Sequence, residues 1–248
     1  MKILITGASA GIGKACVELL AKDHQLLIAS RRIEVLETIK KSTGSENIIC
    51  ASLDVSDEEA INQFCIQNKA WLNDVDVLVN NAGLALGRES FEDHPSEDIN
   101  TVIKTNVLGL IHLTHKLLPF MIKNKKGHII NLGSVAASMT YTGGSIYCSS
   151  KAAVHMFSDG LRLDLGGKNI KVSVVAPARV ETDFSVVRYR GDKKAADKVY
   201  QGYRPLKSED IAKTIEWMIQ QPEHVNIQDL TISSVDQPNC VTINPFKG

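Results

Sequence analysis

Short apolar runs alternate along the chain with longer amphipathic stretches. The apolar runs are rich in β-branched and aliphatic residues, and nearly continuous runs of this kind are typical of buried parallel strands. They predict seven strands, at 2–6, 25–29, 47–53, 75–80, 128–132, 171–176 and 230–233. Since a helix-length periodic segment lies between most of them, the pattern predicts an α/β fold built on a doubly wound parallel sheet flanked by helices.

Two of the predicted helices, at 96–123 and 145–165, are unusually long and are apolar on more than one face. Extra apolar surface of this kind indicates contact with a second subunit. It is equally consistent with helices that simply cover the sheet, and the pattern does not separate the two interpretations.

The alternation stops at 177–205, where arginines and tyrosines replace the long apolar runs. A long segment at this point is typical of a substrate-binding lid, and a solvated basic loop is the alternative. The tail at 236–248 has two prolines and no periodicity. We therefore expect the tail either to hang free or to pack on a neighbouring subunit.

Composition favours one domain over residues 1–248 and a small substrate. The chain has 248 residues, 44% of them hydrophobic, and equal numbers of acidic and basic side chains, so its net charge creates no strong field that would attract nucleic acid or an anionic membrane. The apolar start of the chain is too short for a signal peptide. The five cysteines are scattered, without metal-ligand spacing, so we expect no metal and a reducing cytoplasm: Cys16, Cys50, Cys65, Cys148 and Cys240.

A glycine-rich turn follows the first strand, with Gly7, Gly11 and Gly13 leading into an amphipathic helix. Glycines let the backbone approach a pyrophosphate closely, and a helix N-terminus presents unpaired N–H groups to an anion. The spacing differs from the usual dinucleotide fingerprint, and a plain strand-to-helix turn is the alternative. The strand-turn-helix context favours a Rossmann-like dinucleotide site.

The end of the second strand carries Arg31 and Arg32, where an NAD site would have an acidic residue. Two guanidiniums can bind the 2′-phosphate of NADP, and no carboxylate is present there to repel it. The sequence therefore predicts NADP, although these arginines would also suit the start of a solvated helix.

Tyr147 and Lys151 are four residues apart, and Ser134 precedes the tyrosine by thirteen positions. On a helix, residues i and i+4 share a face. A cation there stabilises a phenolate, which lets the tyrosine act as a general acid or base. This arrangement indicates a carbonyl reductase.

Together with Asn80-Asn81-Ala82-Gly83 and Asn106, these motifs resemble the short-chain dehydrogenase/reductase family from the first strand to about Thr182. The resemblance implies that Tyr147 transfers the proton and that Ser134 holds the reacting oxygen. It implies that Lys151 lowers the tyrosine pKa and binds the nicotinamide ribose, and that Asn106 anchors a relay water. Singly, each residue also has an ordinary structural interpretation.

The same resemblance implies the cofactor contacts along the cleft: Gly7, Ser9, Gly11, Ile12, Gly13, Arg31, Arg32, Asp54, Val55, Asn80, Ala82, Gly83, Tyr147, Lys151, Pro177, Val180 and Thr182. One position departs from the family, since Pro177-Ala178-Arg179 stands where Pro-Gly is usual. Alanine is penalised at positive φ. Either this turn has negative φ, or the loop beside the nicotinamide lies differently.

Two segments, 80–87 and 181–192, resemble the NADP-dependent 3-hydroxy acid dehydrogenases, a subgroup that acts on serine, allo-threonine and related acids or semialdehydes. Members are usually homotetramers, with homodimers as the alternative. A small carboxylate substrate needs a cation near the reacting carbon. We expect Arg179, Arg188 or Arg190 to supply it.

Two other activities fit the same scaffold: a 3-oxoacyl carrier-protein reductase and a broad-specificity carbonyl reductase. A candidate of another class is a sensor or scaffold protein that binds NADP without turnover. The four residues Asn106, Ser134, Tyr147 and Lys151 favour an enzyme over such a protein.

Overall fold

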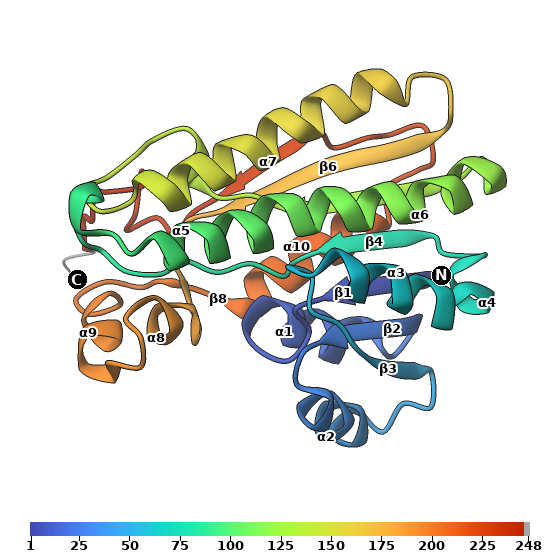
Figure 1. Cartoon of the computed structure of the whole chain (residues 1–248), viewed down its shortest axis with the longest axis horizontal. Helices are drawn as coiled ribbons and strands as arrows, with labels where there is room; N and C mark the ends of the chain where they lie inside the picture. Colours follow the sequence, from blue (N-terminus) through green and yellow to red (C-terminus); the bar gives the residue numbers. More distant parts are fainter. Residues whose placement is uncertain (246–248) are drawn as a thin grey trace.

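The centre of the computed structural model, which describes residues 1–245, is a sheet in the order β3-β2-β1-β4-β5-β6-β9 with every neighbouring pair parallel (Figure 1). Its strands are β1 (Lys2–Thr6), β2 (Gln25–Ser30), β3 (Ile48–Ser52), β4 (Val77–Asn80), β5 (Gly127–Leu132), β6 (Ile170–Pro177) and β9 (Asp229–Ile232). The predicted sheet is thus confirmed, with strand ends shifted by at most two residues.

Helices cover both faces of the sheet and enclose one apolar core on each (Figure 1). One layer holds α1 (Gly11–Leu20), α2 (Ile33–Thr43) and α10 (Ser208–Ile219). The other holds α3 (Glu58–Gln67), α4 (Lys69–Leu72), α5 (Ser96–Ile103), α6 (Leu110–Asn124) and α7 (Ser145–Asp164). Short 3-10 turns lie at η1 (Phe91–Asp93) and η3 (Val135–Ala137).

The helix expected at 96–123 is interrupted. A π-helical segment, η2 (Lys104–Gly109), separates α5 from α6. Gly109 ends this segment where a Cβ would lie 2.2 Å from the Val55 carbonyl oxygen, so only glycine allows the approach. Apolar periodicity does not reveal such an interruption, which often marks a functional position. Here it carries Asn106.

The segment at 177–205 is folded and does not form an open loop. It contains β7 (Val180–Glu181), α8 (Phe184–Arg188) and α9 (Lys193–Lys198), and β7 pairs in parallel with β8 (Leu206–Lys207). Figure 1 shows α8 and α9 side by side at one end of the sheet.

The tail does not simply hang free, because part of it packs against its own chain. Packing of the tail on a second subunit stays a prediction. Asp236 and Gln237 are buried in this chain, and the Gln237 Oε1 accepts a hydrogen bond of 3.0 Å from the Arg179 N–H. Cys240 packs with Cys148 and Ala136. Sequence periodicity could not show this, because the tail is held by side-chain contacts with distant residues; residues 246–248 lie outside the described part.

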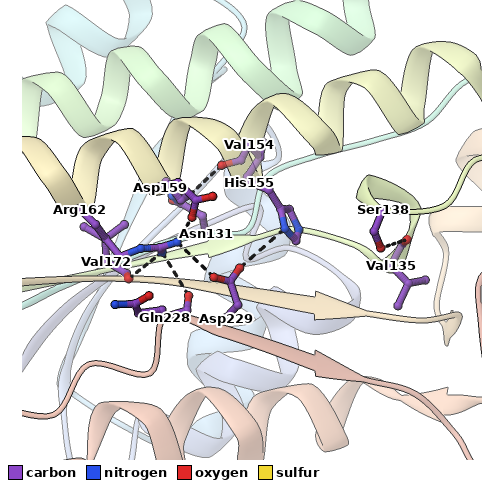
Figure 2. A network of polar contacts seen from close by, with 11 residues as sticks. Asn131, Val135, Ser138, Val154, His155, Asp159, Arg162, Val172, Gln228 and Asp229 are labelled. Atoms are coloured by element: carbon purple, nitrogen blue, oxygen red, sulfur yellow. Dashed lines mark hydrogen bonds and ion pairs between the residues drawn. The ribbon is translucent and has the colours of Figure 1, made fainter.

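Helix α7 is fastened to the sheet edge by Arg162 (Figure 2). The guanidinium donates to the Val172 carbonyl on β6 at 3.2 Å, to the Gln228 carbonyl at 3.3 Å and to Asp229 on β9 at 3.1 Å. It also contacts Asp159 on its own helix. One side chain thus fixes α7 against two strands.

A chain of buried amides and hydroxyls joins β4, β5 and the long helices. Asn80 donates to Thr114 on α6 and to Asn131 on β5, both at 2.9 Å, and Asn131 donates to Ser158 on α7 at 2.9 Å. Buried polar groups are costly when unpaired, so this network specifies how both helices sit on the sheet.

Replacing Asn131 by leucine removes two hydrogen bonds and leaves Asn80 and Ser158 short of partners. We expect the free energy of unfolding to fall by about 2 to 4 kcal/mol, measured by urea denaturation. The control is Gln67→Leu, an exposed site at the end of α3. A loss below 1 kcal/mol at Asn131 would show that the network is not needed for stability.

None of the helices within residues 1–245 has the length and apolar character needed to cross a membrane. All five cysteines are free thiols.

Candidate active site

A cleft of about 840 Å³ opens at the carboxyl ends of the central strands. This is where parallel α/β sheets bind ligands, at the point between β1 and β4 where the strand order reverses. It runs from the glycine turn, past Tyr147, to α8. Among residues 1–245, no group of histidine, cysteine and acidic side chains forms a metal site.

The glycine turn is packed so closely that side chains would not fit. Gly7 has φ of +64°, and a Cβ there would lie 2.9 Å from the Ala82 Cα. A Cβ on Gly13 would lie 2.5 Å from the Gly7 carbonyl oxygen. Asn81, the residue after β4, holds the turn by donating to the Thr6 and Gly7 carbonyls at 2.8 and 3.2 Å. The N-terminus of α1 is thereby held open toward the cleft, which suits a pyrophosphate.

The two arginines after β2 have different partners. Arg32 donates to the Ser9 hydroxyl of the glycine turn at 2.9 Å. The Arg31 guanidinium lies 3.9 Å from Asp54 and is largely exposed. Both line the cleft, so two guanidiniums and a hydroxyl converge at one end of it.

Helix α7 presents Tyr147 and Lys151 to the cleft one turn apart, as their spacing predicts. The Lys151 ammonium is buried and donates to the Leu132 carbonyl at the end of β5, at 2.6 Å. Ser134 follows β5 and hydrogen-bonds the Tyr147 phenol. Phe184 of α8 packs edge-on against the tyrosine ring, with the centroids 5.6 Å apart.

Asn106 lies behind this group, fully buried in η2. Its amide nitrogen donates to the Leu84 carbonyl and the Ser150 hydroxyl at 2.8 and 3.0 Å, and its oxygen accepts from the Leu84 N–H at 2.8 Å. The side chain therefore fixes the loop after β4 against α7. Its role in a proton relay remains a prediction.

The three arginines expected to bind the substrate carboxylate differ in burial and in their hydrogen-bond and ion-pair partners. Arg190 pairs with Glu89 and Asp98 at the surface. The Arg179 backbone is fixed by Gln237. Arg188 is buried within the cleft, and no carboxylate within residues 1–245 pairs with it.

Arg188 donates to the Gly87 carbonyl at 3.1 Å, to the Tyr141 hydroxyl at 2.7 Å and to the Gly143 carbonyl at 3.2 Å. These bonds use three of the five N–H groups of a guanidinium. Its Cζ lies 5.7 Å from the centroid of the Tyr147 ring. A cation is thus held beside the tyrosine with donors to spare.

Most of the expected cofactor residues line the cleft: Gly7, Ser9, Gly11, Ile12, Arg31, Arg32, Asp54, Val55, Ala82, Gly83, Tyr147, Lys151, Pro177, Val180 and Thr182. Two do not. Asn80 is turned into the buried amide network, and Gly13 is covered by the turn itself. Alternation along β4 explains the first case, because Asn81 takes the position beside the glycine turn.

The sequence interpretation missed Arg88, Tyr141, Gln237 and Cys240, which also line the cleft. Arg88 and Tyr141 lie on loops, and the other two lie in the tail, which was expected either to hang free or to pack on a neighbouring subunit. For Arg88, its position soon after the Asn-Asn-Ala-Gly run was a sequence signal that could have placed it at the cleft. At the position where the family usually has the glycine of Pro-Gly, Ala178 does not have a positive φ. The first of the two alternatives for this turn is therefore the correct one.

A family model for short chain dehydrogenases matches residues 1–192, more than half of the chain. This chain belongs to the short-chain dehydrogenase/reductase family.

Relatives within the family are similar over nearly their whole length. Serine 3-dehydrogenase of Rhizobium radiobacter is 42% identical over 236 residues, covering 95% of this chain and 94% of that protein. The NADP-dependent 3-hydroxy acid dehydrogenase of Schizosaccharomyces pombe is 42% identical over 235 residues, covering 93% and 91%. A solved serine dehydrogenase, in its closed form with NADP+, is 39% identical with a TM-score of 0.93, and the match covers 100% of both chains.

The family's tyrosine and lysine have strongly shifted pKa values in this chain. Burial lowers the pKa of Lys151 to about 8. Burial raises the pKa of Tyr147 above its usual range, while the hydrogen bond to Ser134 and the charge of Arg188 act in the opposite direction. Arg188 is thus one cation that lowers the tyrosine pKa in this structure, while the Lys151 ammonium donates to the Leu132 carbonyl. The expected effect of Lys151 on the tyrosine pKa stays a prediction.

The lowered pKa of Lys151 predicts how stability depends on pH. Between about 8 and its ordinary value of 10.5, the unfolded chain holds a proton that the folded chain has lost, so stability rises with pH. Relative to Lys151→Met, the wild type should gain up to about 1.4 kcal/mol per pH unit in this window. Urea unfolding at several pH values measures this. Parallel stability curves for the two proteins would mean that the pKa is normal.

Proposed function

We propose that this protein is an NADP(H)-dependent oxidoreductase that interconverts small 3-hydroxy acids and their 3-oxo or semialdehyde forms. The observation that carries the substrate class is Arg188, a buried guanidinium beside Tyr147 with no carboxylate partner among residues 1–245. A carboxylate a few bonds from the reacting carbon would complete it. Relatives named for serine and 3-hydroxy acids support the same class.

The cofactor is NADP in this proposal, and the residues present fit it. The glycine turn has no room for larger residues, and its glycines keep the α1 N-terminus accessible for the pyrophosphate. Arg32, Ser9 and Arg31 converge where a 2′-phosphate needs cations and donors. Bound there, the nicotinamide would supply or accept the hydride.

The chain's own side chains handle the oxygen and the proton. In reduction, Tyr147 donates its O–H proton to the carbonyl oxygen, and Ser134 donates a hydrogen bond to the same oxygen. Arg188 holds the substrate carboxylate so that the carbonyl faces the phenol. Lys151 supplies positive charge beside the developing oxyanion, and Asn106 keeps α7 against the loop that contains Leu84.

The proposal is tested by following NADPH absorbance with 3-hydroxypropionate, 3-hydroxyisobutyrate, serine and allo-threonine, using NADP and NAD in parallel. We expect turnover with NADP and, because of Arg31 and Arg32, little with NAD. Tyr147→Phe should lower kcat by at least about 10²-fold while NADP still binds. Turnover only of acyl thioesters or bulky ketones would point instead to one of the two alternative reductases.

Arg188→Met should raise KM for 3-hydroxy acids by at least about tenfold, because a charge-assisted hydrogen bond to the carboxylate is lost. Activity on the uncharged methyl ester of 3-hydroxypropionate should change little, which separates lost binding from a damaged fold. Arg179→Met is the matched control. If KM rises for Arg179→Met and not for Arg188→Met, the carboxylate site lies at Arg179.

We also propose that the enzyme is a homo-oligomer, most simply a homotetramer. Met156 and Leu163 on the outer face of α7 are 70% and 84% exposed, which is unusual for apolar side chains on one helix. A second copy of the chain would cover them. Sedimentation velocity should show a multimer that Leu163→Glu reduces to a smaller species, whereas a monomeric wild type would end this proposal.

Five free thiols and no disulfide among them support the cytoplasm as the compartment.

A further inference from the structure

Two cysteines lie side by side where the C-terminal tail packs against the start of α7. Cys148, in the first turn of α7, and Cys240, in the tail, are both buried and form one cluster with Ala136. The ionisation of Cys148 acts on the pKa of Cys240, as expected for two neighbouring sulfur atoms. Tyr141 and Tyr147 pack against the same cluster. Two thiols from distant parts of the sequence thus meet beside Tyr147.

The other three cysteines are placed differently. Cys16 lies in one apolar core and Cys65 packs against the other, and burial raises their pKa values to about 12 and about 11. Cys50 packs against the first core, where burial and then Glu37 raise its pKa to about 11. Within residues 1–245, Cys240 is the cysteine that lines the cleft. A small oxidant that enters the cleft therefore meets Cys240 first.

Cys240 has the surroundings of a thiol that can react. Burial raises its pKa and Cys148 adds to this, while the guanidiniums of Arg179, Arg188 and Arg88 act in the opposite direction. The thiolate is the reactive form, and redox-sensing cysteines are typical of positively charged sites that small molecules reach and that hold a second cysteine. Cys240 faces the cleft, has cations around it and has Cys148 as its neighbour.

The tail holds Cys240 in place through hydrogen bonds on both sides of it. The Asn239 side-chain oxygen accepts from the N–H groups of Val241 and Thr242 at 2.9 and 2.7 Å, which makes a tight turn around residue 240. Gln237 is bonded to the Arg179 N–H. A covalent bond at Cys240 would therefore act on a structured segment and change the wall of the cleft.

We propose that Cys148 and Cys240 are a redox pair, which a peroxide converts into a disulfide that ties the tail to α7 beside Tyr147. The Cys240 thiolate attacks one peroxide oxygen and becomes a sulfenic acid, while the O–O bond breaks and the leaving hydroxide takes up a proton to form water. The Cys148 thiol then attacks the sulfenic sulfur, which forms the S–S bond and releases a second water. The two sulfurs together lose two electrons, which reduce the peroxide. In a reducing compartment, thiol exchange reverses the bond.

The disulfide changes the geometry next to Tyr147. Sulfur atoms in van der Waals contact are about 4 Å apart, whereas a disulfide bond is about 2 Å long. The tail and the first turn of α7 must therefore approach each other, and Cys148 is the residue after Tyr147. Because a displacement of about 1 Å can cost about 10²-fold in catalysis, we expect kcat to fall at least about tenfold.

Mass spectrometry tests the pairing. The protein is treated with a small excess of hydrogen peroxide, the remaining thiols are alkylated, and the peptides are identified. We expect the peptides of Cys148 and Cys240 to be linked, and those of Cys16, Cys50 and Cys65 to be alkylated. This readout needs no turnover, so it decides the pairing even where the proposed function fails. Oxidation of either cysteine without a link, or no oxidation of the two, would overturn the proposal.

Turnover of 3-hydroxypropionate with NADP tests the consequence. Peroxide should slow the wild type at least about tenfold, and dithiothreitol should restore it. Cys148→Ala and Cys240→Ala should each keep the rate that they had before peroxide, whatever that rate is, while Cys50→Ala should respond like the wild type. A linked wild type that is fully active, or equal inactivation of Cys240→Ala, would show that the bond does not control turnover.

Discussion

Two buried cations, Lys151 and Arg188, determine much of what this cleft can do. Each is held without a carboxylate partner among residues 1–245, and each donates to neutral oxygens instead: Lys151 to the end of β5, and Arg188 to Gly87, Tyr141 and Gly143. A buried charge that lacks a counter-ion is unfavourable for folding. Such a charge is tolerated where a bound anionic ligand supplies the missing counter-ion. The site is therefore prepared for anions before any ligand arrives.

Holding these cations in place requires contacts from several distant segments. Arg162 fixes α7 to β6 and β9, and the amide network behind Tyr147 fixes it to β5. Arg190 is bonded to Glu89 and Asp98, and the Gly87 N–H donates to the Arg188 carbonyl. These contacts fasten the end of α8 to the loop that carries Gly87. The exposed ion pair around Arg190 thus serves to position its buried neighbour.

The parts of the site that depend on local sequence could be predicted, and those that depend on tertiary contacts could not. The glycine turn and the Tyr147–Lys151 spacing follow from strand-turn-helix and helical geometry, and both lie where expected. Arg188 and Arg190 differ by two positions in sequence, yet one is buried and the other is paired at the surface, because acidic partners from 89–98 meet only Arg190. The π-helical interruption at Asn106 and the inward packing of Gln237 likewise depend on distant segments.

The protonation state of Tyr147 depends on the charges of both Arg188 and Lys151. Burial favours the protonated phenol, so Tyr147 in the protein alone is prepared to donate a proton and not to accept one. Oxidation of an alcohol needs the phenolate, which requires positive charge nearby. Arg188 already acts in this direction, but a substrate carboxylate bound to it would neutralise that contribution. The Lys151 ammonium, one helical turn away and with a pKa of about 8, would then supply positive charge to stabilise the phenolate, so the two directions of the reaction depend differently on this lysine.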